Sequence, residues 1–220
     1  MKKKLIIAFS LMLSFVVWTL LVCTVDVKTI GANQTNVGFA ELNSFVHNLT
    51  GTNMFLYAIT DWLGLVPIFV SFGFAILGLV QLIKRKRLSA VDYDILVLGG
   101  FYIAVMTAYV LFEFVVINYR PILIDGNLES SYPSSTTMLV LCVMPTALMQ
   151  LRSRIKNPTI KRCASVAIVL FSAFMVIGRV LSGVHWITDI IGGALLSASL
   201  VMLYDSFLKM NKNIITGTKL

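Results

Sequence analysis

Long apolar runs dominate this chain and leave few folds open to it. Six segments come close to the roughly 20 mainly apolar residues that a helix needs to cross a bilayer. They are residues 5–25, 62–83, 95–117, 135–151, 164–181 and 186–208. Hydrophobic residues make up 58% of the chain and charged residues only 13%. Since backbone groups in lipid must bond within their own segment, the sequence predicts an all-α membrane protein with six transmembrane helices.

The basic residues predict how these helices are oriented. If the N-terminus is cytoplasmic, the cytoplasmic side receives all Lys and Arg residues except Lys28, Arg120 and Arg179. The cytoplasmic groups are Lys2–Lys4, Lys84–Arg87, the five basic residues of 152–162, and Lys209, Lys212 and Lys219. The positive-inside rule therefore favours both termini in the cytoplasm and a location in a plasma membrane of bacterial type. Topology accounts for the net charge of +8, which does not here indicate nucleic-acid binding.

The remaining segments predict one membrane domain over residues 1–220. The N-terminal run is longer than a signal-peptide core and lacks a small-residue cleavage site, so we expect an uncleaved anchor helix. The long loop after it is predicted to hold a short amphipathic helix at Val37–Val46. Cys23, Cys142 and Cys163 lack the spacing of metal ligands.

Small and aromatic residues predict how the helices pack and where they meet the membrane surface. A face of small residues on the last segment indicates close helix packing. Its members are Gly192, Gly193, Ser197 and Ala198. Asp61, Trp62 and Trp18 lie near segment ends and are predicted to be interfacial anchors.

Residues 178–189 place three polar groups, Arg179, His185 and Asp189, inside an otherwise apolar part of the chain. Charged groups at membrane depth are costly and mark functional sites. His185 and Asp189 are four residues apart, so on a helix they share a face and the carboxylate can hold the imidazole. Arg179 offers a forked donor that suits a phosphate group.

Two further segments end on the same predicted side of the membrane. Arg120 follows the third apolar segment, and the run Ser131–Thr137 begins the fourth. Hydroxyls and free N–H groups at a helix start, here at Ser134 and Ser135, bind anions well. Paired arginines neutralise a phosphoryl group during its transfer. The sequence therefore predicts a phosphate site at the outer rim of the bundle.

These segments resemble the three signature motifs of the type-2 phosphatidic acid phosphatase family, whose core is shared with vanadium haloperoxidases. The family motifs read Lys-x6-Arg-Pro, Pro-Ser-x-His and Ser-Arg-x5-His-x3-Asp. The matching residues are Arg120-Pro121 in the first, Pro133-Ser134-Ser135 in the second, and Arg179, Gly183, His185 and Asp189, preceded by Gly178, in the third. The resemblance covers roughly residues 55–208.

The resemblance implies a phosphohydrolase that uses neither a metal nor another cofactor. His185 would attack phosphorus and form a phosphohistidine, with Asp189 orienting the imidazole. Arg120, Arg179, Ser134 and the backbone near Ser135 would hold the phosphate oxygens. The substrate would be a membrane lipid phosphate or diphosphate in the outer leaflet, such as phosphatidic acid, phosphatidylglycerol phosphate or an undecaprenyl diphosphate-type carrier.

Two positions depart from the family motifs. Glu113 stands where the family has lysine, and Thr136 stands where it has the histidine that protonates the leaving group. A threonine hydroxyl is too weak an acid for that task, and loss of a general acid costs about 10²–10⁴-fold in rate. Two helical turns separate Glu113 from Arg120, so the spacing favours an ion pair between them.

Three explanations for the missing histidine remain open. Glu113, desolvated and so protonated, could replace the acid. His47 could reach in from the outer loop. The leaving group could also need little protonation, as in a polyprenyl diphosphate.

Two other functions compete with lipid phosphate hydrolysis. One is a catalytically weakened family member that binds lipid phosphate as a sensor or partner protein. The other is a small transporter, which the lack of a broken-helix repeat disfavours.

Overall fold

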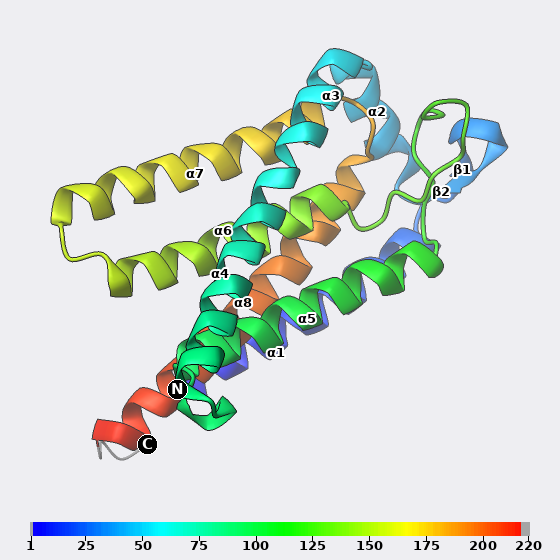
Figure 1. Ribbon diagram of the computed structural model, residues 1–220. Helices are drawn as coiled ribbons and strands as arrows, with labels where there is room; N and C mark the ends of the chain where they lie inside the picture. Colours follow the sequence, from blue (N-terminus) through cyan, green and yellow to red (C-terminus); the bar gives the residue numbers. More distant parts are fainter. Residues whose placement is uncertain (1, 217–220) are drawn as a thin grey trace.

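The computed structural model describes residues 2–216, with side chains as far as Lys209, so Met1, Lys219 and the rest of 217–220 lie outside it. Helices make up most of the described chain (Figure 1). The long ones are α1 (Lys2–Thr24), α4 (Leu65–Arg85), α5 (Tyr93–Phe114), α6 (Ser135–Arg154), α7 (Pro158–Leu181) and α8 (Ile187–Thr216). The short elements are α2 (Ala40–Thr50), α3 (Met54–Leu63), the 3-10 turns Ala32–Gln34 and Leu88–Ala90, and the antiparallel strands β1 (Lys28–Thr29) and β2 (Asn36–Val37).

Each of the six predicted apolar segments forms a helix in the structure. The second begins earlier than predicted, because α3 runs on into α4 across a break at Gly64. Within the described residues, five helical stretches are long and apolar enough to cross a membrane: α1, α3 with α4, α5, α7 and α8. The helix α6 falls short of that measure because it carries Thr, Ser, Gln and Arg residues, and protein rather than lipid covers much of it. The all-α membrane fold is thus confirmed, while a sixth crossing stays a prediction.

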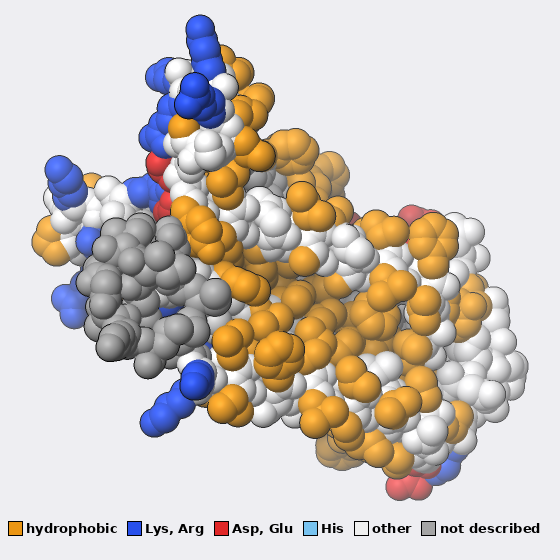
Figure 2. Space-filling model, turned by 90° about the horizontal axis from the view of Figure 1, so that it is seen from below, with side chains coloured by type: hydrophobic (Ala, Val, Ile, Leu, Met, Phe, Trp, Pro, Cys, Tyr) orange, Lys and Arg blue, Asp and Glu red, His pale blue; other side chains and the backbone are white. Residues whose placement is uncertain are grey.

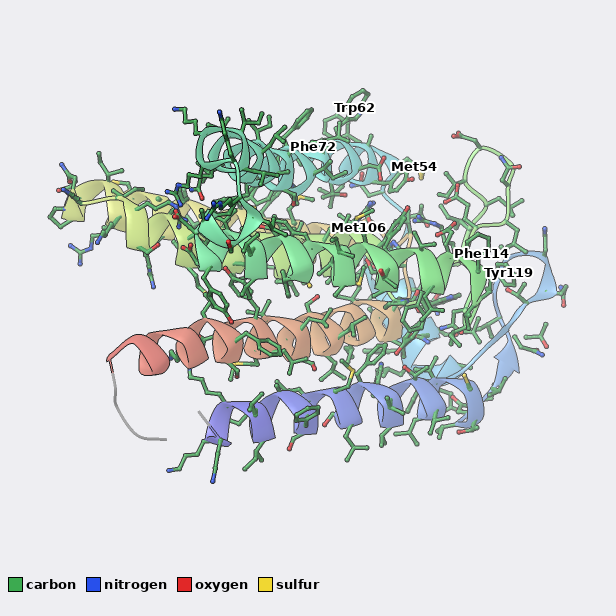
Figure 3. The ribbon with its side chains drawn as sticks, turned by 60° about the horizontal axis from the view of Figure 1, so that its bottom comes forward. Met54, Trp62, Phe72, Met106, Phe114 and Tyr119 are labelled. Carbon is green, nitrogen blue, oxygen red and sulfur yellow. The ribbon has the colours of Figure 1, made fainter. Side chains whose placement is uncertain are left out.

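Helix α8 packs against α1, α5 and α6, and small residues allow its close approach to the α6 region (Figure 3). Gly192 lies directly under the ring of buried Tyr132, and the Ser197 hydroxyl donates to the Met138 carbonyl at 3.2 Å. The predicted inclusion of Ala198 in this face is wrong, since Ala198 is exposed. Its neighbour Ser199 is buried instead and donates to the Ala8 carbonyl of α1 at 3.0 Å.

The predicted amphipathic helix of the outer loop exists as α2, shifted toward the C-terminus. Its buried Asn43 donates to the Gly38 carbonyl at 2.8 Å and to the Thr188 hydroxyl at 3.0 Å, which ties the loop to the start of α8. Trp18 also bonds there, donating from its indole to the Thr188 carbonyl at 3.1 Å. Trp18 is therefore part of the protein packing and not the membrane anchor that its position predicts, whereas Trp62 is exposed.

Cationic side chains gather at the end of the bundle that holds the start of α1 and the end of α8. There Lys4 pairs with Asp205, Arg85 with Asp92 at 2.6 Å, and Arg154 with Asp94 at 2.9 Å. Figure 2 shows most of the Lys and Arg side chains of that view at one end, with apolar side chains covering the flank. This sorting agrees with the predicted orientation of the helices.

Close packing at Gly192 makes it a test of the α8 interface. A Cβ atom there would lie 2.5 Å from the ring of Tyr132, whose hydroxyl is fixed by a 2.7 Å hydrogen bond to Thr19. We expect Gly192→Ala to destabilise the protein by about 1–3 kcal/mol, the usual cost of overpacking. Thermal unfolding in detergent measures the loss. Gly73→Ala is the matched control, because a Cβ on that α4 glycine meets no atom within 4 Å, and an equal loss in both variants would contradict this account.

Candidate active site

Three separated segments meet at the end of the bundle opposite the cations. They are the loop 115–134, the start of α6, and the turn 182–186 between α7 and α8. The side chains of Arg120, Ser134, Arg179, His185 and Asp189 are all buried there. The convergence predicted from the sequence is therefore present in the structure.

His185 lies in the turn before α8, with its ring buried. Its Nε2 atom lies 3.3 Å from Nη1 of Arg120. A guanidinium can only donate, so this contact requires an unprotonated Nε2 and leaves the ring proton on Nδ1, which faces Asp189. Burial lowers the pKa of His185 to about 4, with the nearby arginines adding to the effect and Asp189 opposing it. The ring is thus neutral at pH 7, with the lone pair of Nε2 directed at Arg120.

Asp189 is fully buried and lies in the first turn of α8. Its carboxylate accepts hydrogen bonds from the Trp186 N–H at 3.0 Å and from the Asn118 side chain at 3.1 Å. The distance from its Oδ2 to Nδ1 of His185 is 3.8 Å, which is longer than a hydrogen bond. The predicted shared helical face is wrong in detail, because α8 begins at Ile187 and His185 precedes it.

Glu129 holds Arg120 in place from the same loop. The N–H of Arg120 donates to the Glu129 carbonyl, and its Nε lies 3.0 Å from the Glu129 carboxylate. The predicted ion pair between Glu113 and Arg120 is wrong, because α5 ends at Phe114 and helical spacing does not extend to Arg120. Glu113 is exposed and lines a small cavity together with Ser135 and His185.

Arg179 is only 1% exposed and pairs with a residue that the sequence did not single out as part of the site. Its Nη2 donates to Asp61 of α3 at 2.9 Å and also to the Thr136 hydroxyl. The predicted role of Asp61 as a surface anchor is therefore wrong. The ring of Tyr57, one turn earlier on α3, lies under both guanidinium groups, 5.0 Å from Arg179 and 5.8 Å from Arg120.

Among the site residues that sequence reasoning missed, only Asp61 carries a clear signal in the sequence. Asp61 is a charged residue within the helical stretch Met54–Arg85, which is otherwise uncharged before Lys84. Tyr57, Asn118 and Glu129 have common residue types in unremarkable positions. Their part in the site depends on how the loops fold.

Several buried polar atoms at the site have no hydrogen-bond partner among the described residues. They include Nε and Nη1 of Arg179, Nδ1 of His185, and the hydroxyls of Ser134 and Thr137. The first N–H groups of α6, which begins at Ser135, have no partner within their own helix. Unpaired donors at a helix start beside a guanidinium fork suit an oxyanion such as phosphate.

His47, on α2, packs against the residue next to His185. Its ring centroid lies 5.6 Å from that of Trp186. Partial burial lowers the pKa of His47, so its ring is neutral at pH 7. Its entry into the site as an acid stays a prediction.

A long apolar groove leads to the site. It has a volume of about 1010 Å³ and runs between α4 and α5, over α6. Phe72 of α4 and Met106 of α5 line it (Figure 3). Asp61, Ser135 and Thr136 form its polar end, and Leu88 and Val91 lie at the other. The groove thus joins the phosphate site to the apolar flank of the protein.

Comparison with known proteins agrees with these motifs. The model of the PAP2 superfamily matches residues 113–212. Residues 113–212, which contain all three motif segments, are thus similar to the PAP2 superfamily.

A solved structure also shares the fold. The chain is similar to the crystal structure of a transmembrane PAP2-type phosphatidylglycerolphosphate phosphatase from Bacillus subtilis, with a TM-score of 0.64 and 21% sequence identity. The similarity covers 92% of this chain and 96% of the other. No curated protein sequence matches the chain significantly.

The lowered pKa of His185 predicts a pH-dependent stability. Between pH 6.5 and about 4 the unfolded imidazole binds a proton that the folded one does not, so stability falls as the pH falls. From pH 7 to pH 5 this group alone should cost about 2 kcal/mol. Unfolding of wild type and His185→Gln in detergent at both pH values measures it. The wild type should lose more stability than the variant; identical losses would show that His185 is not buried in the neutral form.

Proposed function

We propose that this protein is a membrane phosphohydrolase acting on a lipid phosphate or a polyprenyl diphosphate through a phosphohistidine at His185. One observation carries the proposal: a buried, neutral imidazole presents Nε2 beside Arg120, at the polar end of a long apolar groove. The similarity of residues 113–212 to the PAP2 superfamily supports a lipid phosphatase.

In the proposed first step the phosphate group occupies the unpaired donors around Arg179, Ser134 and the start of α6. Nε2 of His185 then attacks phosphorus and the lipid oxygen leaves. Asp189 stabilises the positive ring that forms, and its bonds from Asn118 and Trp186 keep it in position. Water later attacks the phosphohistidine and releases phosphate. The two arginines supply the positive charge, so this route needs no metal ion.

The groove supports a lipid substrate. A volume of about 1010 Å³ lined by apolar side chains is far more than a phosphate group needs, and it suits an acyl or prenyl chain. The cations gather at the opposite end of the bundle, which supports, by the positive-inside rule, a site at the outer leaflet of the plasma membrane. Phosphatidic acid, phosphatidylglycerol phosphate and undecaprenyl diphosphate are the substrates to test first.

Phosphate release tests the proposal directly. Protein purified in detergent is given the three lipids, and released inorganic phosphate is measured for wild type and His185→Ala. We expect release from at least one lipid and its loss in the variant, because no other group replaces the nucleophile. Release that survives in His185→Ala would overturn the phosphohistidine.

The same assay addresses the rival function of a lipid-phosphate sensor. Arg179 forms an ion pair with Asp61, and Arg120 forms one with Glu129. In addition, Thr136 stands at the position of the family histidine. Measurable binding of the lipids with no release from any of them would favour that rival.

The groove gives a second, independent test. Gly99 lines it on α5, and a Cβ added there meets no atom within 4 Å, so we expect Gly99→Phe to place its ring in the groove without disturbing the fold. We expect about tenfold or greater loss of activity on long-chain lipid phosphate, and little loss on a dibutyryl analogue. Gly73→Phe, on α4 outside the groove lining, is the matched control and should leave both activities unchanged. Equal effects on long and short chains would show that the groove does not hold the tail.

A further inference from the structure

The carboxyl group of Asp61 lies beside the position at which the catalytic motifs are incomplete. We propose that Asp61 is the general acid that protonates the leaving group, in place of the histidine that the family has at the position of Thr136. The inference rests on the proposed phosphatase function and adds a catalytic residue to it.

A shared hydrogen-bond donor places Asp61 next to Thr136. Nη2 of Arg179 donates to Oδ1 of Asp61 and to Oγ1 of Thr136, so the two oxygens lie within two hydrogen-bond lengths of each other. The end of α3 also packs against Thr136, because a Cβ on Gly64 would lie 3.6 Å from the Thr136 methyl group. The Asp61 side chain is 57% exposed, which leaves it room to move from Arg179 toward a bound substrate.

The linings of the two cavities indicate on which side of a bound phosphate Asp61 and Glu113 would lie. Ser135, at the start of α6, lines both of them. The small cavity holds His185 and Glu113, whereas the polar end of the groove holds Asp61 and Thr136. In-line displacement puts nucleophile and leaving group on opposite faces of phosphorus, and the leaving group carries the apolar tail. Asp61 is thus on the leaving-group side, and Glu113 is on the side of the nucleophile.

The resting ion pair explains how Asp61 would obtain its proton. A phosphate that binds the unpaired Nε and Nη1 of Arg179 comes to lie beside the Asp61 carboxylate, which is bound to Nη2 of the same guanidinium. Two adjacent anions repel and share a proton, here the one that a monoanionic phosphate brings with it. The Asp61 carboxyl group then holds this proton on the side where the lipid oxygen leaves.

Both half-reactions balance with this single group. In the first, Nε2 of His185 forms a bond to phosphorus, the bond from phosphorus to the lipid oxygen breaks, and the Asp61 proton moves to that oxygen. In the second, Asp61 takes a proton from water, the water oxygen bonds to phosphorus, and the bond to Nε2 breaks. The departing phosphate then takes the proton back from Asp61, which pairs again with Arg179. The sum is monoanionic lipid phosphate plus water giving lipid alcohol plus monoanionic inorganic phosphate, with Asp61 and His185 restored.

A comparison of leaving groups tests the role of Asp61. The leaving group of phosphatidic acid is an alkoxide, which needs a proton. The leaving group of 4-nitrophenyl phosphate is a phenolate, which does not. We expect Asp61→Asn to slow phosphate release from phosphatidic acid by about 10²–10⁴-fold and release from the aryl phosphate by less than about tenfold. Thr136→His in the Asp61→Asn background should restore much of the lost rate, because it returns an acid to the motif. Asp125→Asn, in the exposed loop after α5, is the matched control and should alter neither rate.

Each outcome decides between the roles. Equal losses on both substrates in Asp61→Asn would mean that Asp61 only positions Arg179 or supports the fold, and equal gains would mean that it competes with phosphate; either overturns the acid. A failure of Thr136→His to recover any rate would also count against it. Wild-type release that depends on His185 keeps the proposed function intact in all these cases. If neither substrate shows phosphate release that depends on His185, the proposed phosphatase function is refuted, and the role of Asp61 is refuted with it.

Discussion

The end of the protein that holds the site depends on the buried residue Asp189. Its carboxylate accepts bonds from Asn118 in one loop and from the Trp186 N–H in another, and its backbone carbonyl accepts from the Ser134 N–H at the start of α6. A buried carboxylate is costly unless such donors surround it. The bonds that satisfy Asp189 are therefore also the bonds that bring the three motif segments together. Fold and site at this end depend on the same group.

The arginines of the site rest in a neutralised state. Glu129 pairs with Arg120 and Asp61 pairs with Arg179, while the chain has glutamate and threonine where the family motifs have lysine and histidine. A phosphate bound at the unpaired donors of Arg179 would therefore share the guanidinium groups with carboxylates that already neutralise them. Burial of an apolar tail in the groove offsets the cost of this sharing for a lipid and gives no such help to free phosphate. The charge balance and the groove thus favour the same class of ligand.

Sequence reasoning was successful where the signal was local and failed where it depended on the paths of loops. Apolar length alone located the helices, and motif spacing brought Arg120, Arg179, His185 and Asp189 to one end. The partner of Arg120 could not be predicted, because it depends on the end of α5 at Phe114 and on the loop that brings Glu129 back. Asp61 was misjudged for a similar reason, since only the break at Gly64 and the packing of α3 on α7 turn it toward Arg179.

The groove between α4 and α5 has a consequence for the timing of hydrolysis. In the proposed mechanism, water that cleaves the phosphohistidine would approach from the face that the lipid oxygen has left, which is the groove side. A tail lying in the groove would occupy that approach and keep water out until the dephosphorylated lipid has returned to the bilayer. The lipid itself would then control the access of water to the site. The order of the two half-reactions would follow from the shape of the groove without any moving lid.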